Sequence, residues 1–555
     1  MAIDTIVNIA ALRANTVAFT SVQTLGYHTV GDGGEGIYVL NSGDTSSGDN
    51  GGSIIVDAAG HRWYLSNLRT PTARQFGAYG DNSHDDTSAF INASNWLAAL
   101  GGGTLVVEQG TYLIANSLTL ACAMAPTQGA KLAIAGGKTL ALNGSIDAGL
   151  YQIITGAGAS TFGPAVGVAY PEWFGAATGG DDAAPTQACL AACVANKVGL
   201  HFSQTMRFAN TVTITAAVPI TSNSGVNVLP TGGFTGDAFR ITAFEGACEM
   251  RLPAILNFTV GTGLRLQGTT LTRVYVPLIQ NCLEGVVLET KAAAGYTSCL
   301  DNTIIFEVIT GCQNAISFAA DNNGNVMQGN LLQGNFITGV RNAVIFNAPG
   351  LVPNWDSNSF IFQAVDGNQA SFTGLQNNSS GQVPRVTFEV RDWYGGFWAD
   401  GSGGAINGSF NGLKFYANFA QEPWLYSQFN VFNSVNCRYD VNYRQSNLVA
   451  AATSPNSRGS FNGGAPLMQN RFLLNMTLPG DLGVGAYQSF YCYSPFIDGG
   501  SFNYSAVPFN MQGAIINAIV TTGGQSELQI TVRNVGPNTL SAGLSVQVAV
   551  TVGTA

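Results

Sequence analysis

Hydrophobic and polar residues alternate along most of this chain with the two-residue period of β-strands. Near the N-terminus, residues 36–40 and 52–56 are short segments of this kind, separated by turns rich in Gly, Asp and Ser. Near the C-terminus, residues 513–520, 527–533 and 544–552 are longer alternating segments, which are typical of an antiparallel sandwich. We therefore expect a small β module at one end of the chain and a β-sandwich at the other.

Two helices are expected between these ends. Asp85 and Asp86 precede an apolar series with helical spacing, and three glycines end it. A degenerate second copy of this arrangement occupies residues 170–202. Phe76 and Phe174 hold corresponding positions in the two copies, which gives an offset of 174 − 76 = 98 residues.

From about residue 200 the helical period disappears and an internal repeat begins. Residues 302–311, 330–339, 358–367 and 386–395 align, and their closing glycines are spaced by 339 − 311 = 28, 367 − 339 = 28 and 395 − 367 = 28 residues. Strands and turns at a fixed step of this size predict a β-solenoid, in which each coil buries its apolar face by stacking on the next. The predicted fold class is therefore all-β.

The repeat also predicts which side chains point into the solenoid. One inward column consists of Ile304, Leu332, Phe360 and Phe388, and most of another consists of Phe306, Phe362 and Val390. The residues between these columns are more polar. An outward column, with members about 4.8 Å apart, consists of Glu307, Asn335, Gln363 and Arg391.

The composition excludes several classes of protein. Charged residues make up only 10% of the chain, and 69 of its 555 residues are Gly, which does not fit a disordered chain, a coiled coil or a charge-rich helical bundle. The net charge is −10 and we find no basic run, so nucleic acid and anionic membranes are not expected partners. No apolar stretch has the length of a spanning helix and no signal peptide is recognised, so we expect neither membrane insertion nor ordinary export.

Nine cysteines are dispersed along the chain without a C-x-x-C pair or a nearby His at metal-ligand spacing. This distribution favours small, buried apolar residues in a protein that folds under reducing conditions. Cys189 and Cys193 are spaced to share a helical face, and we interpret them as packing residues. We predict no metal site, because no acidic loop has a calcium-binding spacing, and no cofactor.

Residues 74–114 contain the motifs Gln-Phe-Gly-Ala-Tyr-Gly-Asp, Asp-Asp-Thr-Ser-Ala-Phe, Gly-Gly-Gly-Thr-Leu-Val-Val and Gly-Thr-Tyr-Leu-Ile. They resemble the first segment of the pectate-lyase-like right-handed parallel β-helix. With the Gly-rich module before them and a second such segment at Tyr-Pro-Glu-Trp-Phe-Gly-Ala, the arrangement is similar to bacteriophage tailspikes that act as polysaccharide depolymerases. The second segment departs from the family pattern, because it lacks the clean Gly-Asp-Gly and Asp-Asp-Thr elements.

This resemblance implies a homotrimer of right-handed parallel β-helices on the phage tail, synthesised in the host cytoplasm and acting at the host cell surface. Its N-terminal part would attach to a tail or baseplate protein, and its glycan partner would be capsule or lipopolysaccharide O-antigen. The expected domains are a virion-proximal β module, a first capping segment with an insert, the main β-helix, and a sandwich for trimerisation or glycan binding. Their expected boundaries are 1–70, 71–170, 171–470 and 471–555.

Glycoside hydrolysis usually needs two carboxyl groups that flank the scissile bond. In this charge-poor chain the densest group of candidates begins at Glu389, and Asp366 precedes Tyr394 by one coil because 394 − 366 = 28. Asp366 and Asp392 would then lie on the order of 7 to 8 Å apart, within the range of inverting enzymes. The candidate catalytic residues are Asp366, Glu389 and Asp392.

The same region offers groups that could bind sugars, because aromatic rings have apolar faces and Arg donates paired hydrogen bonds. The candidate substrate-binding residues are Arg391, Trp393, Tyr394, Trp398 and Asp400. An alternative interpretation is that Glu389 and Arg391 form an outer ion pair while Trp393 and Tyr394 pack at a subunit boundary. Other repeats place Val308, Phe336 and Ala364 at the position of Asp392, which allows an inward side chain there. Glu307 and Glu422 are reserve candidates.

Three functions remain open at the level of sequence. Paired carboxylates and scarce basic residues favour an endo-acting glycoside hydrolase. A polysaccharide lyase, which needs a cation and a base such as Arg, Lys, His or Tyr, is the first alternative. A tail adhesin that binds glycan without cutting it is the second, because it accounts for the same fold and the same aromatic residues.

Overall fold

The computed structural model describes most of the chain up to residue 419 and mainly strands beyond it. The described residues are 3–66, 69–176, 180–242, 245–366, 372–394, 404–419, 427–432, 437–443, 448–453, 458–463, 470–477, 487–493, 502–509, 516–522, 527–534 and 545–554. They belong to two compact units. The first contains residues 1–212 and 217–226, and the second contains residues 213–216 and 227–555.

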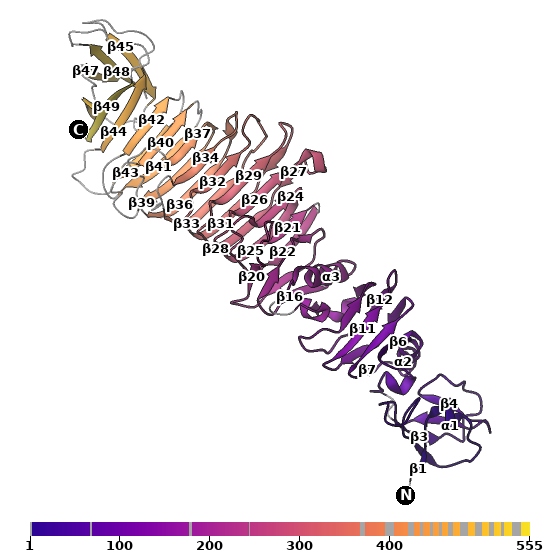
Figure 1. The fold of residues 1–555 in the computed structure, drawn as a ribbon. Coiled ribbons are helices and arrows are strands. Elements are labelled where there is room, and N and C mark those ends of the chain that lie inside the picture. Colours follow the sequence, from indigo (N-terminus) through magenta and orange to yellow (C-terminus); the bar gives the residue numbers. More distant parts are fainter. Residues whose placement is uncertain are drawn as a thin grey trace. The chain divides into compact units, whose positions relative to one another are not determined.

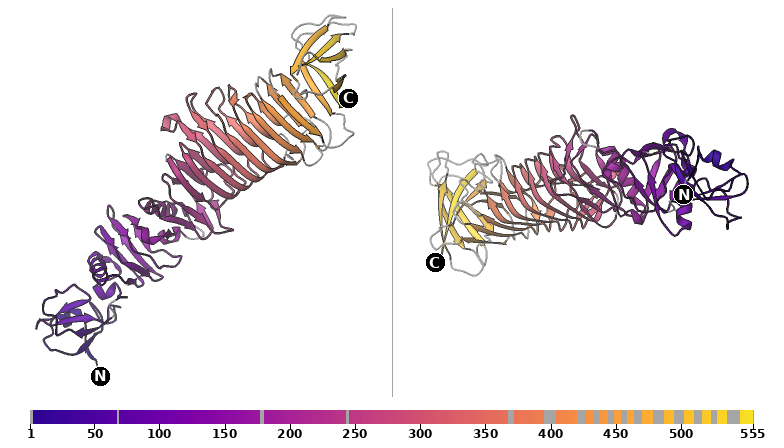
Figure 2. Two further views of the ribbon diagram at one scale, coloured as in Figure 1. Left: turned by 180° about the vertical axis from the view of Figure 1, so that it is seen from behind. Right: turned by 90° about the horizontal axis from the view of Figure 1, so that it is seen from below.

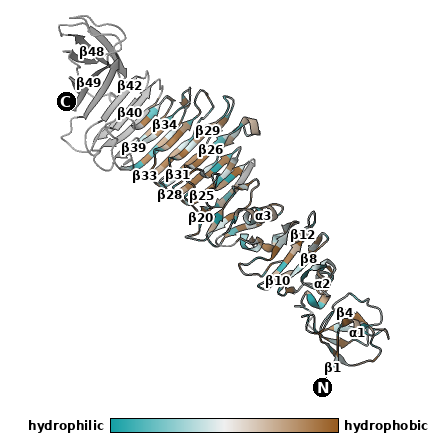
Figure 3. Ribbon diagram, viewed as in Figure 1, coloured by the Kyte–Doolittle hydropathy of each residue, from teal (hydrophilic) through white to brown (hydrophobic). Residues whose placement is uncertain are grey.

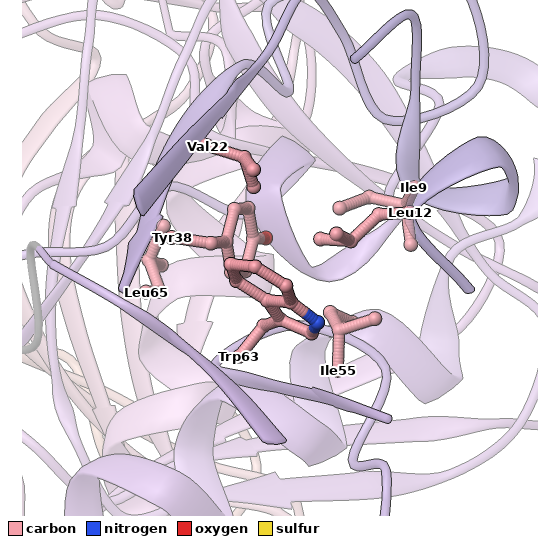
Figure 4. Packing of buried hydrophobic residues seen from close by; sticks show 7 residues of the cluster. All are labelled: Ile9, Leu12, Val22, Tyr38, Ile55, Trp63 and Leu65. Carbon is pink, nitrogen blue, oxygen red and sulfur yellow. The ribbon is translucent and has the colours of Figure 1, made fainter. Parts of the chain in front are cut away.

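The first unit begins with a small β module. Its elements are β1 (Asp4–Ile6), α1 (Ile9–Arg13), β2 (Ser21–Thr24), β3 (Gly36–Leu40), β4 (Ile54–Val56) and β5 (Arg62–Leu65). The strands form one sheet in the order β1-β2-β3-β5-β4, and α1 packs on it through Ile9 and Leu12 around the buried Tyr38 and Trp63 (Figure 4). The sequence predicted only strands here. The short helix α1 begins where the Asn8 side chain accepts the N–H of Ala11 at 2.8 Å.

A first set of parallel coils follows in the same unit. Its elements are η1 (Arg74–Phe76), β6 (Asp81–Asp85), α2 (Thr87–Ala99), β7 (Thr104–Val107), β8 (Gly110–Ile114), β9 (Leu118–Leu120), β10 (Ala123–Pro126), β11 (Ala130–Ile134), β12 (Thr139–Leu142), β13 (Ile154–Gly156) and β14 (Ala159–Phe162). Strands pair in parallel as β7 with β10, β8 with β11 and β13, and β9 with β12 and β14. The predicted helix is confirmed as α2. Asp86 holds its N-cap position, but it is the carboxylate of Asp85 that accepts the N–H of Thr87, at 2.9 Å.

The degenerate second copy is built in the same way. Its elements are η2 (Pro164–Val166), β15 (Val168–Ala169), η3 (Pro171–Phe174), α3 (Ala183–Val194), β16 (Gly199–Phe202), β17 (Met206–Phe208), β18 (Val212–Ile214) and β19 (Ile220–Ser222). Asp85 accepts hydrogen bonds from the N–H two residues further on and from the Asn116 side chain, at 3.2 Å. Asp181 does the same with the N–H two residues further on and with Asn210, also at 3.2 Å. The duplication inferred from the sequence is therefore present in the contacts.

The second unit is a parallel β-helix, which confirms the predicted solenoid (Figures 1 and 2). Its first sheet contains β20 (Asn227–Pro230), β22 (Glu245–Arg251), β23 (Ala254–Leu256), β25 (Thr270–Gln280), β27 (Ser298–Leu300), β28 (Thr303–Thr310), β30 (Val326–Gln328), β31 (Leu331–Thr338), β33 (Ser359–Asp366), β36 (Thr387–Tyr394), β39 (Lys414–Phe419), β41 (Arg438–Tyr443) and β43 (Arg458–Gly463). Each long strand of this sheet pairs in parallel with the equivalent strand of the next coil.

A second parallel sheet closes each coil. It contains β21 (Phe239–Thr242), β24 (Thr262–Gln267), β26 (Glu284–Thr290), β29 (Asn314–Ala320), β32 (Asn342–Asn347), β34 (Thr373–Asn377), β37 (Gly404–Gly408), β40 (Ser427–Phe432), β42 (Leu448–Thr453) and β44 (Asn470–Thr477). The shorter elements η4 (Ala292–Ala294), β35 (Val383–Pro384) and β38 (Phe410–Asn411) lie in the connections. Apolar and polar residues alternate along many of these strands (Figure 3).

The predicted columns of the first sheet are confirmed. The inward residues Ile304, Leu332, Phe360 and Phe388 are in register and buried, as are Phe306, Phe362 and Val390. Glu307, Asn335, Gln363 and Arg391 are exposed. Each strand then has a second outward residue directly after the exposed one, and the next inward residue is Ile309, Ile337, Val365 or Trp393. This shift of the alternation by one position places Asp392 on the outer face and not in the core.

A ladder of buried asparagines closes one corner of the coils. Asn302 donates its side-chain N–H to Oδ1 of Asn330 at 2.9 Å, and Asn330 donates to Oδ1 of Asn358 at the same distance. Each side chain also donates to a backbone carbonyl of an earlier turn, as Asn330 does to Cys299 at 3.0 Å. The ladder satisfies polar groups that the stacked turns would otherwise bury unpaired.

The C-terminal strands are antiparallel, as the sequence predicted. They are β45 (Tyr487–Tyr493), β46 (Phe502–Phe509), β47 (Ile516–Thr522), β48 (Glu527–Asn534) and β49 (Ser545–Thr554). β49 pairs antiparallel with β44 and β46, and β48 pairs antiparallel with β45 and β47. Among the described residues, no helix is long and apolar enough to cross a membrane. The four domain boundaries given above stay predictions.

Candidate active site

The two predicted catalytic aspartates lie on the outer face of the first sheet. Strands β33 and β36 pair in parallel with Asp366 beside Tyr394 and Ala364 beside Asp392. Asp366 and Asp392 are therefore one coil and two residues apart, as the repeat predicted. A strand spacing of about 4.8 Å and a two-residue rise of about 6.6 Å place their Cα atoms about 8 Å apart.

Neighbouring coils fix the orientation of both carboxylates. The side-chain N–H of Gln363 donates to Oδ2 of Asp392 at 3.2 Å, and the hydroxyl of Thr338 donates to Oδ2 of Asp366 at 3.1 Å. Both aspartates are partly exposed. The pair is thus held from one side and reaches solvent, which is what a glycosidic bond between two carboxyl groups requires.

Glu389 and Arg391 lie beside this pair on the same face. The guanidinium Nε of Arg391 is 3.8 Å from Oε1 of Glu389, and its Nη1 donates to Oε1 of Gln363 at 3.4 Å. The outer ion pair that the sequence offered as an alternative is therefore present. Its contacts are long and the Arg391 side chain is 64% exposed, so the guanidinium can still bind a ligand.

The structure overturns the expectation that Trp393 stacks against a sugar. The side chain is fully buried, with ring centroids 5.9 Å from Phe372 and 6.4 Å from both Phe388 and Phe415. The cause is the shift in alternation described above, which turns residue 393 into the core together with Ile309. Trp398, Asp400 and Glu422 lie outside the described residues, as does the side chain of Tyr394.

A second polar group on this face was not predicted as a unit. The guanidinium carbon of Arg251 is 5.7 Å from the ring centroid of Tyr275, and the Tyr275 hydroxyl donates to Oε1 of Glu307. Burial and the neighbouring Glu307 carboxylate raise the pKa of Tyr275 to about 12. Tyr275 therefore stays protonated and is a poor base for a lyase. Only Glu307 was singled out in the sequence, because Tyr275 precedes the aligned repeats by a longer step of 305 − 275 = 30 residues.

The second sheet carries a charged network of its own. The buried Asp237 binds Nε of Arg240 at 2.8 Å and Nε of Arg265 at 3.0 Å, and Nη1 of Arg265 is 3.2 Å from Oε2 of Glu289. Burial would raise the pKa of Asp237, but the hydrogen bonds and charges of Arg265 and Arg240 hold it below its usual value. We interpret this closed network as structural, because its charges are already paired.

Glu284 lies near this network and is held differently. Its carboxylate accepts hydrogen bonds from Asn314, at 2.7 Å, and from Ser317. Burial raises its pKa, although the hydrogen bonds from Ser317 and Asn314 and the charge of Arg265 oppose this. Sequence reasoning named neither Asp237 nor Glu284 as a site residue, since no other coil repeats them. In the described part of the chain, no group of three or more His, Cys, Asp or Glu side chains could hold a metal ion.

The fold and the outer carboxylates define a parallel β-helix protein with an acidic outer site. Its N-terminal module is more specific, since residues 5–67 match the family described as the phage tail protein small four-stranded beta-sheet domain. The resemblance to phage tail proteins is therefore confirmed for that module. No curated protein matches the chain in sequence.

Solved structures with a similar fold include phage tailspikes. The tailspike protein gp49 of Acinetobacter baumannii bacteriophage Fri1, a capsular polysaccharide depolymerase, is 10% identical, with a TM-score of 0.24 over 100% of this chain and 98% of that one. The tailspike of E. coli bacteriophage HK620 is 9% identical, with a TM-score of 0.31 over 89% of this chain and 96% of that one. WceF of Pantoea stewartii, a glycan biofilm modifying enzyme, is 11% identical, with a TM-score of 0.20 over 100% and 72%. Because these scores are low, the function proposed below rests on the chain's own residues and its N-terminal module.

Proposed function

We propose that this protein is a phage tailspike that binds a bacterial surface polysaccharide, capsule or O-antigen, and cuts it by endo-glycoside hydrolysis. The observation that carries the proposal is the parallel register of β33 and β36, which sets Asp366 and Asp392 side by side on an exposed face. A Cα separation of about 8 Å fits the carboxyl separation of about 6.5 to 9.5 Å in inverting glycosidases. The phage tail module supports a place in the virion tail.

In this proposal one aspartic acid protonates the glycosidic oxygen as the bond breaks. The other, as a carboxylate, takes a proton from the water that attacks the anomeric carbon from the opposite face, so both proton transfers are balanced within the site. The hydrogen bonds from Thr338 and Gln363 hold the two carboxyl groups in place. Arg391 and Glu389, on the same face, would bind sugar hydroxyl groups through donors and acceptors respectively.

The remaining parts of the proposal concern attachment and assembly. The N-terminal module would dock on a phage tail or baseplate protein, and the β-helix would form a homotrimer after synthesis in the host cytoplasm. The virion would then present the acidic face to glycan at the host cell surface. These statements follow from the tail module at residues 5–67 and from the resemblance stated above. They are tested by the oligomeric state of the purified chain and by its incorporation into particles.

The first experiment is digestion of a panel of purified bacterial capsules and O-antigens. New reducing ends without the ultraviolet absorbance of an unsaturated uronate would support hydrolysis. Asp366→Asn and Asp392→Asn should then each lower kcat by about 10²- to 10⁴-fold, the usual contribution of a general acid or base. Glu389→Gln tests the third carboxylate, and Glu249→Gln, an exposed carboxylate in β22, is the matched control.

The alternatives give different readouts in the same assay. Uronate absorbance would mean a lyase, and attention would move to Arg391 and Tyr394. Glycan binding without either signal would mean a tail adhesin. Full activity in both aspartate variants would contradict the proposed site while leaving depolymerisation itself intact.

A further inference from the structure

The Arg251 cluster (Arg251, Tyr275 and Glu307) and the candidate catalytic residues lie on one face of the same sheet. The register runs from Arg251 to Tyr275, Ile305, Gln333, Ile361 and Glu389, one residue from each successive coil. Tyr275 and Glu389 are therefore four strand spacings apart, which is about 19 Å at about 4.8 Å per spacing. The beginning and the end of this column are rich in charge.

The residues between the two ends carry no charge. They are Ile305, Gln333, Asn335, Ile361 and Gln363. Gln333, Asn335 and Gln363 are exposed, and so is 40% of Ile305. Amide groups offer both donors and acceptors, and the isoleucines offer apolar surface between them. A long chain rich in hydroxyl groups and poor in charge matches such a face better than a polyanion does.

The Arg251 cluster is held in one arrangement before any ligand arrives. Arg251 lies over the Tyr275 ring and its Nη2 is 3.0 Å from Oε1 of Glu249, while the Tyr275 hydroxyl is committed to Glu307. The Glu307 side chain is exposed, so its second carboxylate oxygen can accept hydrogen bonds. An aromatic face, a guanidinium and an oriented carboxylate are groups that bind a sugar ring and its hydroxyls.

We propose that the Arg251 cluster is a remote binding site for the same weakly charged glycan, which lies along this face and engages both ends at once. The inference rests on the proposed function, because it assigns the second site to the polymer that the first one cuts. It gives the cluster a role in substrate length. Short fragments can occupy the aspartate pair alone, whereas an intact polymer gains affinity from both sites.

The test compares intact polymer with short fragments. The probe is a capsule or O-antigen that the wild-type protein retains, used whole and as fragments from partial acid hydrolysis. Tyr275→Phe and Glu307→Gln should each raise KM for the intact polymer roughly three- to tenfold, the effect of one lost hydrogen bond. They should leave kcat unchanged, and they should leave KM for the shortest fragments unchanged as well. Tyr296→Phe, the same deletion of a hydroxyl in the loop after η4, is the matched control.

Binding is measured separately with the Asp392→Asn protein, so that cleavage does not obscure it. Weaker binding of intact polymer after Glu307→Gln, with no cleavage by wild-type protein, would support this site and overturn the hydrolase proposal. Equal effects on polymer and short fragments would overturn the remote site, as would effects no larger than those of Tyr296→Phe. Failure of the wild-type protein to retain any polysaccharide would overturn both proposals. Unchanged melting temperatures show that the variants fold.

Discussion

Asp237 shows how a buried charge is tolerated in a chain with so few charges. It is 3% exposed and bound to Arg240 and Arg265, and its pKa lies below the usual value because these partners outweigh burial. A carboxyl group with a depressed folded-state pKa contributes stability at pH values above its unfolded-state pKa. It loses that contribution as the pH falls through the folded-state value. For Asp237 this window lies below about pH 4.

Asp237→Asn should therefore destabilise the protein by about 3 kcal/mol at pH 7, because it leaves two arginines without their carboxylate. The difference from wild type should shrink as the pH falls below about 4. Urea unfolding at a series of pH values measures both effects. Glu249→Gln breaks the exposed pair with Arg251 and should cost less than about 1 kcal/mol. A constant difference across all pH values would contradict the role of the Asp237 charge.

Neighbouring residues also show where sequence reasoning reached its limit. The 28-residue step correctly placed Asp366 one coil before Tyr394 and two residues from Asp392. The strict two-residue alternation failed at the bend, where two successive side chains point outward, and this moved Trp393 from the expected site into the core. A bend of one residue leaves no mark in composition. It is visible only when the next inward residue of every coil is compared.

The asparagine ladder acts at the level of a whole coil corner. Asn302, Asn330 and Asn358 begin the aligned repeats, and their side chains join successive turns through two hydrogen bonds of 2.9 Å. Stacked strands alone leave the polar groups of the turns unpaired, and a buried unpaired group costs about 1 to 3 kcal/mol. The sequence displayed these residues in the alignment, but their period alone does not distinguish a buried ladder from an exposed row.

Asn330→Ala should destabilise the protein by about 3 kcal/mol or more, because it breaks the ladder on both sides and leaves buried donors and acceptors unpaired. Asn335→Ala in the same strand β31 is the matched control, since that side chain is exposed. Its effect should stay within about 0.5 kcal/mol. Thermal unfolding of both variants measures the difference. Equal shifts would mean that the ladder contributes no more than an outer side chain.

For the whole molecule, the cysteines report on the packing of both units. The eight cysteines whose side chains are described are buried and free, as the sequence predicted. Burial raises the pKa of Cys299 to about 11, so its reactive thiolate form is scarce at neutral pH.

The native protein should therefore expose at most one of its nine thiols, Cys492, to a thiol reagent such as DTNB at pH 8, and denaturant should release all nine. Colorimetric titration with and without guanidinium chloride counts them. Rapid reaction of two or more thiols in the native protein would contradict the packing of at least one coil.

The parts of the fold that could be predicted are those with a period. The solenoid, its columns and the duplicated capping segments all repeat in the sequence, at 28 residues or at 98. The Arg251 cluster and the Asp237 network occur once each, and their members come from coils of unequal length. Their partners are fixed only by register across coils. The sequence therefore identified individual charged residues but not the groups they form.

The constant coil length has a consequence for how such a protein could change. Because Asn302, Asn330 and Asn358 are spaced by 330 − 302 = 28 and 358 − 330 = 28 residues, removing or duplicating one whole coil keeps every column and the ladder in register. It would move the Arg251 cluster relative to Asp392 by one strand spacing, about 4.8 Å, without altering either group. The number of coils is then a gauge that matches the protein to the repeat length of its polymer, adjustable in fixed increments by recombination between equivalent turns.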